Sequence, residues 1–302
     1  MHKRLLILSL IFFQFIGAQQ IPSVEHRIRD LYVKSLTNGK SYLWLEHISK
    51  NIGGRLSGSL NAQRAIDWVK DELNDIDYLD SVWLQPIMVP KWVRGTFEYA
   101  NIESSPGNTI NVNVCSLGGS IATPTGGIRA NVVEVKSMKE LDSLGEKNIK
   151  GKIVFFNRPM QPGLVNTFKA YEGVRLLRYQ GAANAARYGA VAVLVRSMNL
   201  RLDDYPHTGV MSYGSLPISK RIPAASISTN DSELLSSMIS LNPNLRFFLR
   251  QDCKNYPEVK SYNVIGQIKG TEFPDKIILV GAHLDSWDLG DGAHDNGAGA
   301  VS

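Results

Sequence analysis

The sequence predicts an α/β fold, and three of its features support that prediction. Apolar residues recur at helical spacing near the start of the chain, in residues 24–36 and again after Asn61. Short strand-like apolar runs alternate with an Ala-rich segment through the middle. Close to the end, four consecutive apolar residues, Ile277 to Val280, are typical of a strand that is buried on both faces. We therefore expect a mixed sheet flanked by helices.

Two amphipathic helices are expected first. Their apolar positions are Val24, Ile28, Leu31, Tyr32 and Leu36 in one helix, and Ile66, Val69 and Leu73 in the other. Between them lies "GGRLSGS", residues 53–59, which can approach a ligand or simply turn the chain. A turn is the preferred interpretation.

A compact inserted unit is expected in the middle of the chain, over residues 117–252. Three strand-like runs precede it, in residues 82–90, 96–103 and 109–119. The unit itself is predicted to contain strands in 131–135, 151–157, 191–197 and 222–228, and helices in 181–190 and 231–239. Asp231 or Asn230 is expected to cap the last helix.

A four-part organisation follows. We expect a signal peptide in residues 1–18, a first part of the main domain in 19–116, the inserted unit in 117–252, and a return to the main domain in 253–302. After Cys253, "SYNVIGQIKG" and "DKIILVGAHLD" are interpreted as neighbouring strands of one buried sheet.

The first residues indicate export. "MHKR" is basic, "LLILSLIFFQFIG" is apolar and Ala18 is small, as in a secretory signal peptide. The apolar run is shorter than the roughly 20 residues that span a bilayer, so a stable membrane anchor is not expected. Without Lys3 and Arg4 the chain carries 31 basic and 28 acidic residues, scattered along its length, which does not indicate nucleic-acid binding.

Ionisable residues gather directly after the apolar run 277–280. His283 and Asp285 are two apart, so an extended backbone points both side chains to the same side, where Asp285 can orient the imidazole. Asp295 follows a glycine-containing turn and precedes the small residues 297–300, which allow a helix to pack close to the sheet. An imidazole and a carboxylate that meet at a sheet edge favour a zinc site.

Other ligand loops fit this stretch less well. An EF-hand needs acidic residues at alternate positions, whereas Asp285, Asp288 and Asp291 are three apart. A phosphate loop would be opposed by the carboxylates, and the order of residues does not match a serine nucleophile elbow. For these residues taken alone, the alternative is a capped loop whose Asp side chains are satisfied within the protein and bind no ligand.

The order of these segments resembles a known family. "NVIGQIKG" followed by "IILVGAHLDSWDLGDGAHDNGAGA" is similar to the metal-binding core of the co-catalytic zinc exopeptidases. "GKIVFFNRP", "GAANAARYGAVAVLVRS" and "IPAASIS" resemble a protease-associated domain. Five further short segments, from Gly53 onwards, resemble one branch of the family. They are "GGRLSGS", "VPKWVRG", "ATPTGGI", "YPHTG" and "AHLDSWD".

The resemblance assigns roles by position. It implies that His283 binds one of two zinc ions, that Asp295 bridges the two, and that Asp285 steadies His283 as the catalytic carboxylate. It also implies a cis peptide bond between Asp295 and Asn296. His294 is expected to be a surface neighbour and not a ligand. In the family the remaining ligands and the general base follow the helix after Asp295, so this chain is expected to be an N-terminal, inactive fragment of a longer enzyme.

The implied function is that of a secreted or periplasmic zinc exopeptidase. It would cleave dipeptides or short peptides with water activated by two zinc ions, and it would form a homodimer as some relatives do. Two alternatives stay open, a non-catalytic binding protein with a protease-associated domain and a bimetal amidase acting on non-peptide substrates. Cys115 and Cys253 flank the inserted unit, and either a disulfide or two buried free thiols fits their positions.

Overall fold

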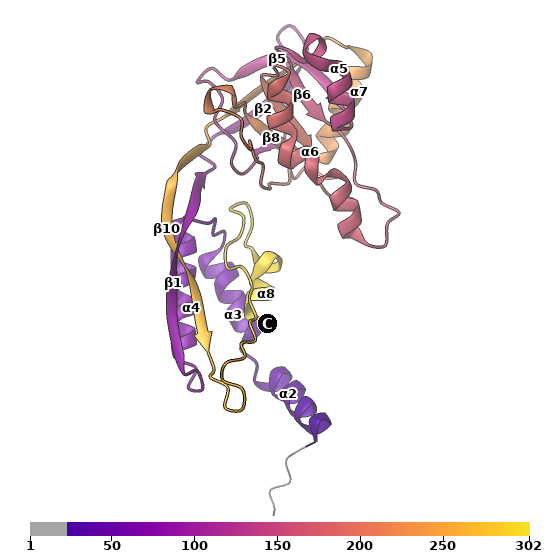
Figure 1. The fold of residues 1–302 in the computed structure, drawn as a ribbon. Helices are drawn as coiled ribbons and strands as arrows, with labels where there is room; N and C mark the ends of the chain where they lie inside the picture. The colour runs from indigo at the N-terminus through magenta and orange to yellow at the C-terminus, as the bar shows by residue number, and fades with distance from the viewer. Residues whose placement is uncertain (1–22) are drawn as a thin grey trace, which may run out of the picture.

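The computed structural model describes residues 23–302, which form two lobes (Figure 1). The first lobe contains a long two-stranded ribbon, the first helices of the chain and its last residues. The second lobe is built on an eight-stranded sheet with helices against it. The expected signal peptide lies outside the described residues. None of the helices between residues 23 and 302 combines the length and the hydropathy that a transmembrane span needs.

The first lobe begins with helices, as predicted. They are α2 (Val24–Asn38), α3 (Ser41–Glu46), the π-helix η1 (His47–Ile52) and α4 (Leu60–Asn74). Ser23 and Ser59 cap α2 and α4 by accepting hydrogen bonds from backbone N–H groups three residues on. A small core of Ile48, Ile52 and Ala65 holds η1 against α4, whereas α2 buries no residue.

The ribbon pairs two segments that are distant in sequence. β1 (Ser81–Val93) runs antiparallel to β10 (Lys254–Gln267), from the Ser81–Gln267 pair to the Val93–Lys254 pair. The register shifts between Val89 and Lys91. Pro90 lies at that shift. Because a proline has no backbone N–H, an interruption of the ladder at this residue loses no hydrogen bond that the residue could donate.

The eight-stranded sheet is mixed. Its order is β3-β2-β9-β5-β6-β7-β8-β4; β5 to β8 are parallel and the remaining pairs are antiparallel. The strands are β2 (Glu98–Ser105), β3 (Asn108–Val112), β4 (Val114–Ser116), β5 (Ile128–Val135), β6 (Ile153–Phe156), β7 (Ala192–Arg196), β8 (Ala224–Ile227) and β9 (Arg246–Gln251). The predicted class, a mixed sheet flanked by helices, is confirmed.

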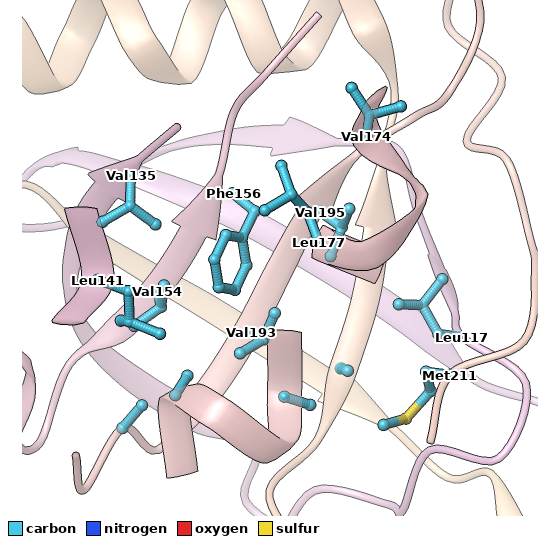
Figure 2. Close-up of a cluster of buried hydrophobic side chains, with 14 of the residues drawn as sticks. Leu117, Val135, Leu141, Val154, Phe156, Val174, Leu177, Val193, Val195 and Met211 are labelled. Atoms are coloured by element: carbon cyan, nitrogen blue, oxygen red, sulfur yellow. The ribbon is translucent and has the colours of Figure 1, made fainter. Parts of the chain in front are cut away.

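Two apolar cores cover the two faces of this sheet. The period of two along β6 sends Val154 and Phe156 into one core and Ile153 and Phe155 into the other. The first core packs against α5 (Met138–Ile149) and α6 (Thr167–Arg187), and Figure 2 shows its labelled side chains. The second packs against α7 (Thr229–Leu241) through Leu235. A short 3₁₀ turn, η2 (Ile218–Lys220), lies before β8.

The cap of α7 differs from the prediction. Ser228 accepts a hydrogen bond from Asp231 N, so Ser228 and neither Asn230 nor Asp231 is the N-cap. Both Ser228 and Asp231 are cap-forming residue types, and β8 fixes the choice because it ends at Ile227.

The sheet extends across the expected boundary at residue 117. β2 pairs with β9 and β4 pairs with β8, so residues 98–116 share the sheet of the unit that was predicted to start after them. An apolar run in the sequence predicts a strand but not the strand with which it pairs. The four-part division stays a prediction, and hydrogen bonding favours a second lobe that begins near residue 94.

The apolar run 277–280 is not a strand, contrary to the prediction. Ile277, Ile278, Leu279 and Val280 are each at least 85% exposed and have no strand partner among the described residues. β10, the expected neighbour of this run, pairs with β1 instead. An extended apolar segment becomes a buried strand only when another strand supplies its backbone hydrogen bonds. The chain then passes through η3 (Ala293–Gly297) and α8 (Ala298–Val301).

Candidate metal-binding site

His283 and Asp295 meet, although eleven residues separate them. His283 Nε2 lies 3.0 Å from Asp295 Oδ1. The side chains are 54% and 74% exposed, so both are open to solvent. The geometry therefore brings together one nitrogen and one oxygen donor, as the sequence predicted.

Asp285 contacts the other nitrogen of His283. The Nδ1 atom lies 3.0 Å from the carbonyl oxygen of Asp285 and 3.2 Å from its Oδ1. Acceptor oxygens therefore lie beside both ring nitrogens, those of Asp285 at Nδ1 and Asp295 Oδ1 at Nε2. In the tautomer with the proton on Nδ1, the oxygens of Asp285 accept that proton and Nε2 presents its lone pair towards Asp295. An imidazole in this tautomer is ready to bind a cation through Nε2.

This donor pair fits a zinc ion. Two ligands at about 2.0 Å in a tetrahedral site lie about 3.3 Å apart, close to the separation of Nε2 and Oδ1 in the structure. Within residues 23–302, however, no group of three or more His, Cys, Asp or Glu side chains is arranged to hold a metal ion. His283 and Asp295 by themselves are too few donors to fill the coordination shell of a zinc ion.

The backbone around Asp295 agrees with the expectation from the resemblance. The Asp295–Asn296 peptide bond is cis. Neither residue has helical backbone angles, so the regular helix begins after them, at Ala298. His294 is exposed and makes no side-chain hydrogen bond or ion pair with the described residues, in keeping with a surface neighbour.

Arg55 holds the loop that connects His283 to Asp295. Its side chain is fully buried and donates to the carbonyl oxygens of Leu284, Asp291 and Gly292, and of Gly53 in its own loop. Burial lowers the pKa of Arg55, partly offset by the charge of Asp285. The segment "GGRLSGS" therefore contacts the site loop through Arg55, in addition to turning the chain as the sequence predicts.

A second arginine holds the middle of the same loop. Arg94 donates from Nε and Nη2 to the two carboxylate oxygens of Asp288, each at 2.8 Å. Burial opposes the charged form of Arg94, but the hydrogen bond to Asp288 and the charges of Glu98 and Asp288 outweigh it, so the pKa of Arg94 is raised. Neither arginine is predicted from the sequence to support the site, because its contacts to the loop after His283 join residues that are about 190 to 240 positions apart.

A cavity of about 480 Å³ lies beside the site. Its wall includes His283 and Asp285, the last residues of the chain, and side chains of α4 and the ribbon. Trp44 and Trp68 also contribute, and both indole N–H groups donate to the carboxylate of Glu72. One side of the site therefore faces space large enough for a small molecule.

The two cysteines are free and buried. Burial raises the pKa of Cys115 to about 12 and that of Cys253 to about 11. Of the two alternatives raised by their positions, the structure shows two buried thiols.

The chain is similar to one family of known proteins. An α/β protein presents an imidazole steadied by one carboxylate and facing another, and residues 263–302 match the model of Peptidase family M28. The chain is 34% identical to a Peptidase M28 precursor of known structure from Shewanella amazonensis SB2B, with a TM-score of 0.81. That match covers 89% of this chain and 59% of the other.

Carboxypeptidase Q is among the curated proteins that the chain resembles. The chain is 38% identical over 278 residues to carboxypeptidase Q of Xenopus laevis, a match that covers 92% of this chain and 56% of that protein. A zinc aminopeptidase from Bacillus subtilis shares the fold with a TM-score of 0.57, at 22% identity and with 86% and 54% coverage. The resemblance to the zinc exopeptidases is confirmed, and the chain spans little more than half the length of these relatives.

Proposed function

We propose that this chain contributes one half of the active site of a zinc-dependent exopeptidase that cleaves dipeptides or short peptides. The observation that supports it best is the approach of His283 Nε2 to Asp295 Oδ1, with Asp285 against Nδ1. The similarity to carboxypeptidase Q, a protein named as a peptidase, supports the same function.

In this proposal His283 and Asp295 hold zinc and Asp285 orients the imidazole. A bound pair of zinc ions would supply an activated water molecule and polarise the scissile carbonyl group. Asp285 keeps the Nδ1 proton on the far side of the ring, so that Nε2 stays available as a ligand. Asp295 offers two oxygens, which suits a carboxylate that bridges two ions.

Export to the periplasm or the outside of the cell is part of the proposal. It rests on the basic and apolar residues at the start of the sequence, which precede the described part of the structure. A homodimer is proposed from the resemblance alone. The alternatives are a metal-free binding protein and an amidase for non-peptide substrates.

A metal titration tests the proposed ligands. Co²⁺, whose visible absorption reports its ligands, is added to the metal-free protein and to the variants His283→Ala and Asp295→Ala. We expect each variant to bind Co²⁺ at least about tenfold more weakly, because each removes one of two identified donors. His294→Ala is the matched control, since it removes a neighbouring exposed imidazole and should leave binding unchanged.

The outcomes separate the candidate functions. If neither His283→Ala nor Asp295→Ala alters the absorption or the affinity, the metal site and the peptidase assignment are wrong. If the site binds metal, hydrolysis of free dipeptides compared with blocked amide analogues, measured on the protein containing this chain, separates the peptidase from the amidase.

A further inference from the structure

Arg94 lies at the junction of the two lobes and uses every one of its hydrogen-bond donors. Besides its two bonds to Asp288, it donates from Nη1 to Ser116 O at 2.7 Å and Glu98 Oε1 at 3.1 Å, and from Nη2 to Thr208 Oγ1 at 2.8 Å. A guanidinium group has five N–H bonds, and here five acceptors receive them. The side chain is about nine-tenths buried, so this arrangement leaves it little freedom to move.

The five acceptors come from both lobes. Ser116, Glu98 and Thr208 belong to the lobe with the eight-stranded sheet, whereas Asp288 belongs to the loop between His283 and Asp295. Arg94 itself follows the last residue of β1, where the chain passes from one lobe to the other. The network therefore connects the second lobe to the site loop through one side chain.

A close packing contact accompanies the network. Trp287, next to Asp288, lies so near Gly118 of the second lobe that a Cβ added at Gly118 would be 2.3 Å from the indole ring. Gly118 also forms a parallel bridge with Val210, two residues after Thr208. Residues 287 and 288 are thus docked on one small surface of the second lobe, made by the chain around Gly118 and Thr208.

The site loop is held at two further points. Arg55 binds the carbonyl oxygens of Leu284, Asp291 and Gly292, which flank the docked residues on both sides. His283 comes one residue before the first of these contacts, and Asp295 comes three residues after the last. His283 and Asp295 therefore stand at the two ends of a loop that Arg55 holds near its ends and Arg94 holds at its middle.

We propose that Arg94 is a positioning residue through which the second lobe sets the geometry of the His283–Asp295 pair, with Thr208 as its contact in that lobe. This proposal rests on the proposed metal function of the pair. It gives the second lobe a role in the chemistry of the site, beyond that of a separate binding module. A bidentate arginine–carboxylate pair suits such a role because its two parallel bonds fix direction as well as distance.

Three variants test the proposal. Thr208→Val removes one hydroxyl group while preserving shape. Arg94→Lys keeps the charge but cannot reproduce the planar fork, and Arg94→Met removes both. The exposed residues Thr37 and Arg201 provide the controls Thr37→Val and Arg201→Met.

The first measurement needs no metal. Hydrogen exchange of backbone amides in residues 284–292, followed by mass spectrometry on the whole chain, reports how firmly the loop is held. We expect faster exchange in this segment for all three Arg94 and Thr208 variants and unchanged exchange in the helices of the second lobe. The two controls should behave like the wild type.

The second measurement is the Co²⁺ titration. We expect about three- to tenfold weaker binding for Thr208→Val, from the loss of one hydrogen bond, and a change in the absorption spectrum for Arg94→Lys. A purely structural role of Arg94 would lower the melting temperature without altering the spectrum of the folded protein.

Two results would overturn the inference, and they differ from those that overturn the metal site. Wild-type exchange in residues 284–292 of Thr208→Val and Arg94→Lys would show that the second lobe does not hold the loop. Faster exchange with an unaltered spectrum and affinity would show that the loop does not set the ligand geometry. Failure of the metal site itself appears instead as wild-type Co²⁺ binding in His283→Ala.

Discussion

Two arginines, neither of them a proposed ligand, hold the loop that connects His283 to Asp295. Arg55 has no exposed surface and binds carbonyl oxygens, while Arg94 binds the carboxylate of Asp288. Carbonyl oxygens that are removed from water need donors, and a guanidinium group supplies several in one plane. Neutral side chains of similar length would leave some of these acceptors unsatisfied. At the scale of single residues, the site therefore depends on two arginine side chains whose charged groups are buried in the protein.

Cys115 gives a prediction about alkaline pH. Its pKa is raised from about 9 in the unfolded chain to about 12 by burial, so the folded protein retains a proton that the unfolded chain loses. The stability that this group contributes is present below pH 9 and falls as the pH rises from 9 towards 12. We expect Cys115→Ala to reduce the loss of unfolding free energy between pH 8 and pH 10 by about 1 kcal/mol.

Urea denaturation at each pH measures this difference. Alkylation in urea without a reducing agent is the control for the state of the cysteines and should label both Cys115 and Cys253. An equal loss of stability with pH in the wild type and in Cys115→Ala would contradict the prediction, and so would unlabelled cysteines.

Helix α6 shows how small residues bring an element close to the sheet. Gly181, Ala182 and Ala185 are buried on the side of α6 that faces the sheet. A Cβ at Gly181 would be 2.7 Å from the ring of Phe156 in β6, which is itself fully buried. Gly173 lies in the same helix, where a Cβ would meet nothing within 4 Å. The two glycines therefore differ in environment while sharing the same secondary structure.

Alanine at these two positions should have opposite effects. Gly173→Ala should stabilise the protein by up to about 1 kcal/mol, because alanine loses less backbone entropy in a helix. Gly181→Ala gains the same propensity but forces Phe156 or the helix to move, so we expect a net destabilisation of about 1–2 kcal/mol. Thermal and urea denaturation of both variants provide the comparison. Equal stabilisation by both would show that α6 does not pack tightly on β6.

At the scale of the whole molecule, the second lobe has its own apolar cores. Both large clusters of buried side chains lie between Ala100 and Leu249, and the first lobe shares none of their residues. Only two chain segments, around Arg94 and Cys253, connect the lobes. A lobe with a complete core and few connections meets the requirements for independent folding.

Two fragments test where this lobe begins. We expect residues 94–253 to fold alone, with a cooperative thermal transition by circular dichroism. Residues 117–252 should not, because they lack β2, β3 and β4 and with them Ala100, Ile102 and Val112 of the second core. Equal stability of the two fragments would restore the boundary at residue 117.

The sequence by itself determined local features of this protein. Apolar spacing predicted α2 and α4, and alternating and continuous apolar runs predicted the strands of the sheet. The two-residue spacing of His283 and Asp285 predicted that Asp285 lies beside the imidazole ring of His283. Each of these depends on neighbours within a few residues, where helix and strand geometry fixes direction. The position of Asp295 was inferred from a turn and small residues together with the family resemblance.

Only the tertiary structure decided the rest. It paired β10 with β1 and left residues 277–280 exposed, it assigned residues 98–116 to the larger sheet, and it brought Arg55 and Arg94 to the site loop. These outcomes depend on which backbone groups find partners tens or hundreds of residues away. Many apolar runs can form a strand, but hydrogen-bond pairing selects among them, and that selection is a property of the folded chain as a whole.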